Sequence, residues 1–219
     1  HTVSAVRDAI ARGGNAFDGI VSGAFVAMVS ESTLTSAGGG GYLMTSVVGE
    51  EPVLLDFFNT MPSGDAGHES LDFQSVSVDF GAAQQEFHIG RGASGVPGNV
   101  PGLLYAQRRW GRLNLAAVLA PAIHAACKGV RLSAQQALFI EVLKPILTHT
   151  PGVSGLYAPK GRLLGEGDTF VMEEFAGFLE ALAKTGPALI QTGAAANAIT
   201  EWAGQGGLIN SSDLAQYKV

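Results

Sequence analysis

The chain has 219 residues, which is long enough for one large domain or two small ones with a substantial core. Only 15% of its residues are charged, against the ~25% typical of soluble domains, and the net charge of −6 argues against a general nucleic-acid-binding protein. No apolar run reaches the ~18 residues of a membrane span, because Asp18 and Glu31 bracket the longest candidate. The single cysteine, Cys127, excludes an internal disulfide and a multi-cysteine metal site, and its Ala-rich surroundings predict a small core residue.

The apolar content, 47% of all residues, has two explanations. One is a domain with a large buried core. The other is a chain that covers part of its apolar surface with a partner polypeptide. The sequence opens at His1 and not at Met, so the compartment stays open between the cytoplasm and a periplasmic or secreted location.

The first part of the chain predicts two helices. Residues 2–12 place apolar side chains at helical spacing, and a Gly-Gly pair at 13–14 ends that pattern. Asn15 is the expected N-cap of a second helix over residues 16–32, which is apolar nearly all round and should therefore be buried. Its small residues at positions 19, 22 and 23 should let a neighbouring element pack closely.

Four consecutive glycines, Gly38–Gly41, follow this helix. Such a run indicates either that the backbone closely approaches another group or that φ is positive at several successive positions. Residues 41–58 then alternate as two strands around a turn at 49–52. Residues 59–75 are expected to form a loop, and residues 76–80 a further short strand.

The remainder is predicted to be mostly helical. Stop and start signals delimit helices over 102–111, 114–129 and 133–149, the last with Ser133 as N-cap. A long connection is expected over 151–170, and further helices over 172–186, 187–207 and 210–217. Strand candidates are few for this much helix, which predicts an α+β layered domain that lacks part of its sheet.

The tests for chemical motifs are negative. The GRGASG segment at 90–95 fits a dinucleotide-binding pattern, but Pro97 follows almost at once and no acidic residue occurs before Glu141. The glycine run is not followed by Lys-Ser or Lys-Thr, as a phosphate-binding loop requires. No G-x-S-x-G elbow and no zinc-binding helix is present either, so the residues alone define no nucleophile–base pair.

The segment ARGGNAFDGIVSGAFVAMVSESTLTSAGGGGYLM (11–44) resembles the opening of the γ-glutamyltransferase family, which includes glutathione hydrolases and related acylases. Three further matches come in the family's order. They are LLDFFNTMP (54–62), GVPGNVPGLLYAQRRWGRLNLAAVLAPAIHAACKGVRLS (95–133) and GGLINSSDLAQY (206–217). The resemblance therefore runs over essentially the whole chain.

This resemblance implies the N-terminal-nucleophile hydrolase fold, an αββα sandwich, with residues 1–219 as its N-terminal, large-subunit part. The chain would give the helical layers and part of the sheets, mostly strands and buried helices in 1–100 and mostly helices in 101–219. A precursor would cut itself, and the new N-terminal Thr of a second, small-subunit chain would be the nucleophile. No catalytic residue is then expected on this chain, and no metal or organic cofactor. The substrate would be a small amide or peptide, and the glycine run would let a strand pass closely against the helical layer.

One departure from the family pattern concerns the substrate. Glutamyl-transferring members have an Arg-Glu pair in the strand motif, and the Arg binds the α-carboxylate of the substrate through a planar fork. Here Phe58 and Asn59 occupy these two positions. Phe58 could instead line a pocket for a more apolar acyl group, as in cephalosporin-acylase-like relatives, or it could simply be a strand-core residue. Arg91, in the neighbouring loop, could supply the missing charge. A further alternative is a non-catalytic binding homologue.

Overall fold

The computed structural model describes residues 1–64 and 71–219. The helices are α1 (Thr2–Ala11), α2 (Ala16–Ser30), α3 (Asn99–Trp110), α4 (Leu115–Lys128), α5 (Ala134–Val142), α6 (Lys144–Leu147), α7 (Pro151–Tyr157), α8 (Glu173–Thr185), α9 (Ala188–Gln191), α10 (Ala194–Ala203) and α11 (Ser211–Gln216). The strands are β1 (Gly41–Thr45), β2 (Val53–Phe57), β3 (Gln74–Asp79), β4 (Gln84–Ile89), β5 (Val130–Arg131) and β6 (Thr169–Phe170). Within these two ranges, the strands form three antiparallel pairs.

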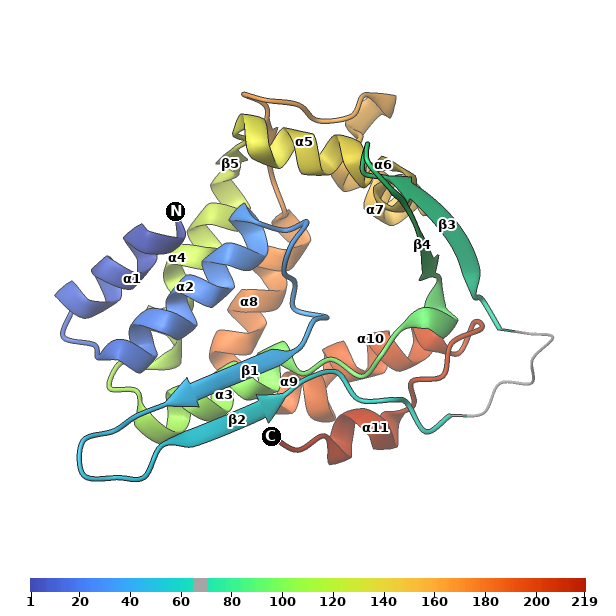
Figure 1. The fold of residues 1–219 in the computed structure, drawn as a ribbon. Helices are drawn as coiled ribbons and strands as arrows, with labels where there is room; N and C mark the ends of the chain where they lie inside the picture. The colour runs from blue at the N-terminus through green and yellow to red at the C-terminus, as the bar shows by residue number, and fades with distance from the viewer. Residues whose placement is uncertain (65–70) are drawn as a thin grey trace.

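A helical block forms one side of the molecule, where α1, α2, α4 and α8 lie side by side (Figure 1). The largest core cluster fills this block and draws on α2, α3, α4, α8 and α9. As predicted, α2 is buried, and its small residues admit α1: a Cβ on Gly23 would lie 2.8 Å from a methyl of Val6. The close α1–α2 contact thus depends on the absence of a side chain at this position.

The start of α2 is fixed by a capping box. The Asn15 side chain accepts the backbone N–H groups of Phe17 and Asp18, and the Asp18 side chain accepts the Asn15 N–H. Asp18 is fully buried and also accepts the backbone N–H groups of Arg112 (2.9 Å) and Leu113 (3.2 Å). One carboxylate therefore joins the first turn of α2 to the turn between α3 and α4.

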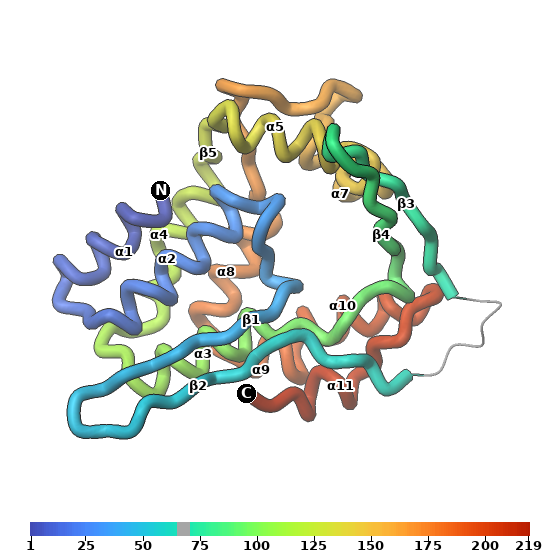
Figure 2. Tube along the Cα trace, viewed as in Figure 1, coloured from blue at the N-terminus to red at the C-terminus, as the bar shows by residue number. Residues whose placement is uncertain are grey.

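The β1–β2 hairpin crosses in front of α3 in Figure 1. Its inner residues Leu55 and Phe57 are buried against α3, where Ala106 belongs to the same cluster. The tube in Figure 2 shows the β3–β4 hairpin on the other side of the molecule, running between α5–α7 and α10. The helices α9, α10 and α11 then bring the end of the chain back toward β2, as the same figure shows.

Several predicted elements are confirmed, among them both strands of the first hairpin, the Ser133 cap of α5 and the short final helix. Gly13 ends the first helix with a φ of +88°. The predicted loop over 59–75 includes residues 65–70, which lie outside the described residues. Its end is already strand, because β3 begins at Gln74.

Other expectations were wrong. The predicted connection over 151–170 contains α7, whose Pro151 start and two glycines, Gly152 and Gly155, hide a helical pattern. The expected helix over 133–149 is divided into α5 and α6, because Pro145 has no N–H for the i−4 bond. The expected helix from Pro187 is divided into α9 and α10 at Gly193.

One strand was missed by the sequence analysis, and one further expectation was wrong. The strand β4 was not predicted, since its Gln and Glu residues give little strand signal; pairing with β3 forms it. Cys127 is exposed and is not a core residue. The buried face of α4 passes through Ala122, Ala125 and Ala126, and Cys127 lies outside that face.

Candidate substrate site

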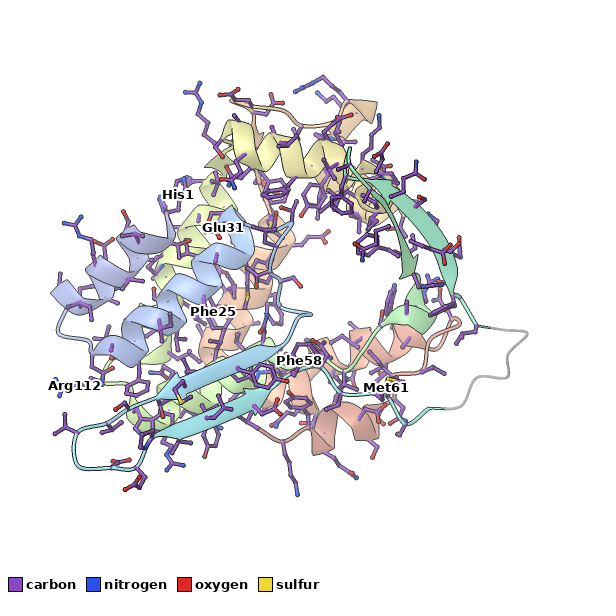
Figure 3. All side chains as sticks on the ribbon, viewed as in Figure 1. His1, Phe25, Glu31, Phe58, Met61 and Arg112 are labelled. Atoms are coloured by element: carbon purple, nitrogen blue, oxygen red, sulfur yellow. The ribbon has the colours of Figure 1, made fainter. Side chains whose placement is uncertain are left out.

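The predicted site residues Phe58 and Asn59 directly follow strand β2 (Figure 3 labels Phe58). The Phe58 N–H donates to the Asp56 carboxylate at 3.0 Å, which fixes the backbone as it leaves the strand. The Phe58 ring stacks on Tyr42, with ring centroids 5.6 Å apart and an angle of 13° between the planes. Phe58 lies one residue beyond the end of β2, and half of it is exposed in this chain.

The Asn59 side chain links its own segment to the glycine run and to the segment before α3. Its side-chain amide donates to the carbonyl oxygens of Gly38 (3.0 Å) and Val96 (3.2 Å). The Tyr217 hydroxyl, near the end of the chain, donates to the Phe58 carbonyl at 2.8 Å. Residues 58 and 59 are thus held by the glycine run, by the segment before α3 and by the residue that follows α11.

The glycine run explains this close assembly. All four residues of Gly38–Gly41 lie in the described part of the chain, and none has a positive φ. A Cβ on Gly40 would lie 2.5 Å from the Asn59 nitrogen, and one on Gly39 would lie 2.8 Å from the Asn99 side chain. Of the two alternatives for the run, close backbone approach is confirmed.

The same run also caps α3. The Gly39 carbonyl accepts the backbone N–H groups of Gly98 (3.0 Å) and Asn99 (2.8 Å). The Asn99 side-chain amide donates to the Ser36 carbonyl at 2.7 Å. Sequence reasoning did not single out Asn99. An Asn at a helix start was the available signal, but its partner lies 63 residues away.

One face of the β1–β2 hairpin carries large apolar side chains that remain exposed. Register pairs Tyr42 with Asp56 and Met44 with Leu54 on this face. The exposed fractions are 59% for Tyr42, 69% for Met44, 56% for Leu54 and 52% for Phe58. Because α3 covers only the opposite face, this face presents an apolar surface that ends at the candidate site.

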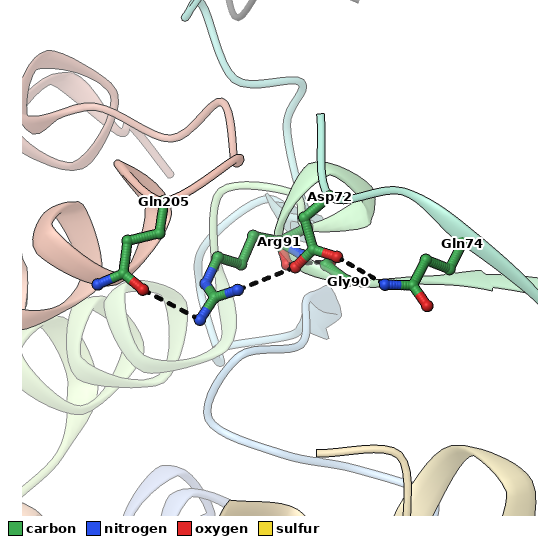
Figure 4. Close-up of polar contacts among 6 residues, drawn as sticks. Asp72, Gln74, Gly90, Arg91 and Gln205 are labelled. Carbon is green, nitrogen blue, oxygen red and sulfur yellow. Dashed lines mark hydrogen bonds and ion pairs between the residues drawn. The ribbon is translucent and has the colours of Figure 1, made fainter. Parts of the chain in front are cut away.

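Arg91, the third predicted site residue, belongs to a separate polar cluster (Figure 4). Its Nη1 lies 3.1 Å from the Asp72 carboxylate, and its Nη2 donates to Gln205 at 3.3 Å. The guanidinium lies over the Trp202 ring, 5.5 Å from the centroid. Within the described residues, no hydrogen bond joins Arg91 to Phe58 or Asn59.

Within this polar cluster, the pKa of the Asp72 carboxyl group is shifted. The pKa of Asp72 lies below its usual range, chiefly because the Arg91 backbone N–H donates to the carboxylate, and the Gln74 amide lowers it further. Asp72 therefore stays ionised opposite the guanidinium. Burial by itself would raise this pKa, but the hydrogen bonds outweigh it.

A metal-binding cluster and a membrane-spanning helix are both absent from residues 1–64 and 71–219. This part of the chain holds no cluster of three or more His, Cys, Asp or Glu side chains able to bind a metal ion. Its helices are also all too short or too polar to cross a bilayer. The arrangement at Phe58 and Asn59 combines a strand end, a glycine run and an exposed apolar face.

Comparison with known proteins agrees with the sequence resemblance. The family model for γ-glutamyltranspeptidase matches residues 3–219. The acylase ACY 1 proenzyme of Pseudomonas sp. (strain SE83) is 31% identical, with 94% of this chain and 38% of that protein covered. The glutathione hydrolase proenzyme of Pseudomonas aeruginosa is also 31% identical, with 94% of this chain and 36% of that protein covered. The chain thus spans between a third and two fifths of the length of these relatives.

A solved structure gives the same result for the fold. The γ-glutamyltranspeptidase of Pseudomonas nitroreducens, complexed with L-DON, superposes with a TM-score of 0.82 at 28% identity, over 99% of this chain and 62% of that one. The predicted fold class, an α+β N-terminal-nucleophile hydrolase fold, is confirmed by this agreement. The chain belongs to the γ-glutamyltranspeptidase family.

Proposed function

We propose that residues 1–219 are the N-terminal, large-subunit part of an autoprocessed γ-glutamyltransferase-like amidohydrolase or acyltransferase. The observation that carries the proposal is the exposed apolar face of the β1–β2 hairpin, in a chain that matches its family from residue 3 to residue 219. A free-standing domain rarely leaves such a sheet face uncovered. The second chain of the same precursor is the partner that would cover it.

The chemistry follows from the division between two chains. The nucleophile would be the N-terminal Thr of the second chain, with its own α-amine as base. Its hydroxyl oxygen would attack the amide carbonyl, the amine would leave with a proton, and water or an amine acceptor would take the acyl group. The present chain would contribute the surface around Phe58 and Asn59 that positions the acyl group.

Arg91 stays a predicted contact for a substrate carboxylate. Asp72 accepts one N–H group of the Arg91 Nη1, and Gln205 accepts one N–H group of its Nη2. Each of these nitrogens carries a second N–H group, so a substrate carboxylate could bind there without displacing either partner.

A second candidate is an acylase that does not use γ-glutamyl groups. Phe58 favours it, because a phenyl ring cannot form the two charge-assisted bonds that an Arg makes to a carboxylate. The stack of Phe58 on Tyr42 presents an aromatic surface at this position. The proteins most similar in sequence include both an acylase and a glutathione hydrolase, so they support either specificity.

The first experiment is intact mass and N-terminal sequencing of every polypeptide in the purified protein. A second chain that begins with Thr, Ser or Cys supports the autoprocessed enzyme. A single uncleaved polypeptide that opens no amide would contradict it and favour a non-catalytic binding homologue.

A second experiment tests the acyl specificity with Phe58→Arg. We expect this variant to gain hydrolysis of γ-glutamyl p-nitroanilide and to lose hydrolysis of apolar acyl anilides. A variant that changes neither activity would show that the pocket is formed elsewhere.

A further inference from the structure

An apolar cavity lies beside the candidate site, between the glycine run, the start of α3 and the helices α8–α11. Its volume is about 330 Å³, at the lower end of the range for small-molecule sites. The side chains that define it are Val100, Phe175, Phe178, Ile190, Ile199 and Leu214. Among the described residues that line it, none is Asp, Glu, Lys, Arg or His.

Two residues connect the cavity to the candidate site directly. Gly38 lines the cavity, and its carbonyl accepts the Asn59 side-chain amide at 3.0 Å. Tyr217 also lines the cavity, and its hydroxyl donates to the Phe58 carbonyl at 2.8 Å. The cavity wall and the backbone of residues 58–59 are therefore parts of one hydrogen-bonded unit.

The residues that line the cavity determine which kind of acyl group it can bind. A γ-glutamyl group carries an ammonium and a carboxylate, and burying either one without a partner is costly. The polar side chains of the lining are Gln191 and Tyr217, and the Tyr217 hydroxyl already donates to Phe58. A hydrocarbon or aromatic chain needs no such partner and gains free energy from burial.

We propose that this cavity binds the apolar end of the acyl group whose amide is opened at the site around Phe58. The inference rests on the proposed function and adds its substrate class, an amide of an unbranched or aromatic apolar acid. The uncharged lining of the cavity and the Phe58 ring then have one explanation, because neither offers a charged partner to the acyl group.

A binding experiment tests the cavity without depending on activity. Octanamide is titrated into the purified complete protein, and the δ1-methyl NMR signals of Ile190 and Ile199 are followed. We expect both signals to shift in a saturable way, with acetamide producing no shift. The absence of shifts with octanamide would overturn the inference, because the cavity would then be closed or filled by the second chain.

Two Trp variants, one inside the cavity and one outside it, provide a matched comparison for the titration. Ile199→Trp places a large ring in the cavity and should abolish the shift of Ile190. Ile10→Trp adds the same ring on α1 at a half-exposed position outside the cavity and should leave the shift unchanged. Equal responses of the two variants would contradict the assignment.

Kinetics with acyl p-nitroanilides test the substrate class. Along the series from the butyryl to the octanoyl substrate, each added methylene should raise kcat/KM by up to about fourfold, because it is buried in the cavity. Ile199→Trp should flatten this series, and Ile199→Ala should move its optimum to longer chains. Turnover without any dependence on chain length would refute the acyl pocket while leaving the enzyme intact. Failure to cleave any anilide, γ-glutamyl included, would instead refute the proposed function, and the NMR titration would still decide the cavity.

Discussion

A Cβ atom on Gly40 would lie 2.5 Å from the backbone nitrogen of Asn59 and 2.6 Å from its side-chain oxygen. The two residues are 19 positions apart, and their contact holds the glycine run against the residues that follow β2. The candidate site therefore depends on a position without a side chain. This relationship also gives the first prediction.

Gly40→Ala should destabilise the protein by about 1–3 kcal/mol, because the methyl group would displace the backbone at residues 58–59. Gly38→Ala is the matched control, since its Cβ would meet only the Ser36 hydroxyl, at an ordinary 3.7 Å. Urea unfolding of both variants measures the free energies. Equal losses of stability in the two variants would show that the close approach at Gly40 is not what matters.

Asp18→Asn should lower the free energy of unfolding by about 1.5–3 kcal/mol. The buried carboxylate accepts N–H groups from Asn15, Arg112 and Leu113, and an amide would present its own N–H groups to some of these donors. Chemical denaturation compares it with Asp8→Asn, a change on the exposed face of α1. A loss no larger than that of the control would remove Asp18 from its proposed role as a structural link.

Arg91→Lys should lower the melting temperature, although by less than Asp18→Asn. An ammonium is a compact point charge and lacks the planar fork that reaches Asp72 and Gln205 while lying over the Trp202 ring. Thermal unfolding gives the stability, and KM for the acyl p-nitroanilide that the wild type cleaves tests the predicted substrate contact. A raised KM at unchanged stability would assign Arg91 to the substrate and not to the fold.

Asp168 should make stability depend on pH in the acid range. Two side-chain hydrogen bonds from Arg162, and then the backbone N–H of Gly165, lower the pKa of Asp168 to about 2. Since the folded-state pKa is depressed, the stability from the ionised carboxylate is fully present above its unfolded pKa of about 3.9 and is lost as the pH falls through about 2.

The measurement for Asp168 is urea unfolding of wild type and Asp168→Asn at a series of pH values. The difference in unfolding free energy should be constant near neutral pH and should shrink below about pH 4. Glu166→Gln, on the exposed part of the same loop, is the control. A difference at pH 2.5 as large as the difference near neutral pH would contradict the assigned cause.

The sequence by itself determined the elements with strong local signals. The Asn15 and Ser133 caps, the Gly13 stop and the alternation of the first hairpin all act within a few residues, so the pattern was sufficient to predict them. The order of motifs over the whole chain likewise identified the family. That Phe58 stands where the family pattern has an Arg stays a prediction from that resemblance.

Tertiary structure alone decided what depends on distant partners. The strand β4 exists because β3 pairs with it. Cys127 is exposed because it does not lie on the side of α4 that packs against the core. The pairing of Arg91 with Asp72 and the contact of Tyr217 with Phe58 join segments that no local pattern connects. Local propensity acts through neighbours in sequence, whereas the site and its cavity arise where segments up to 159 residues apart meet.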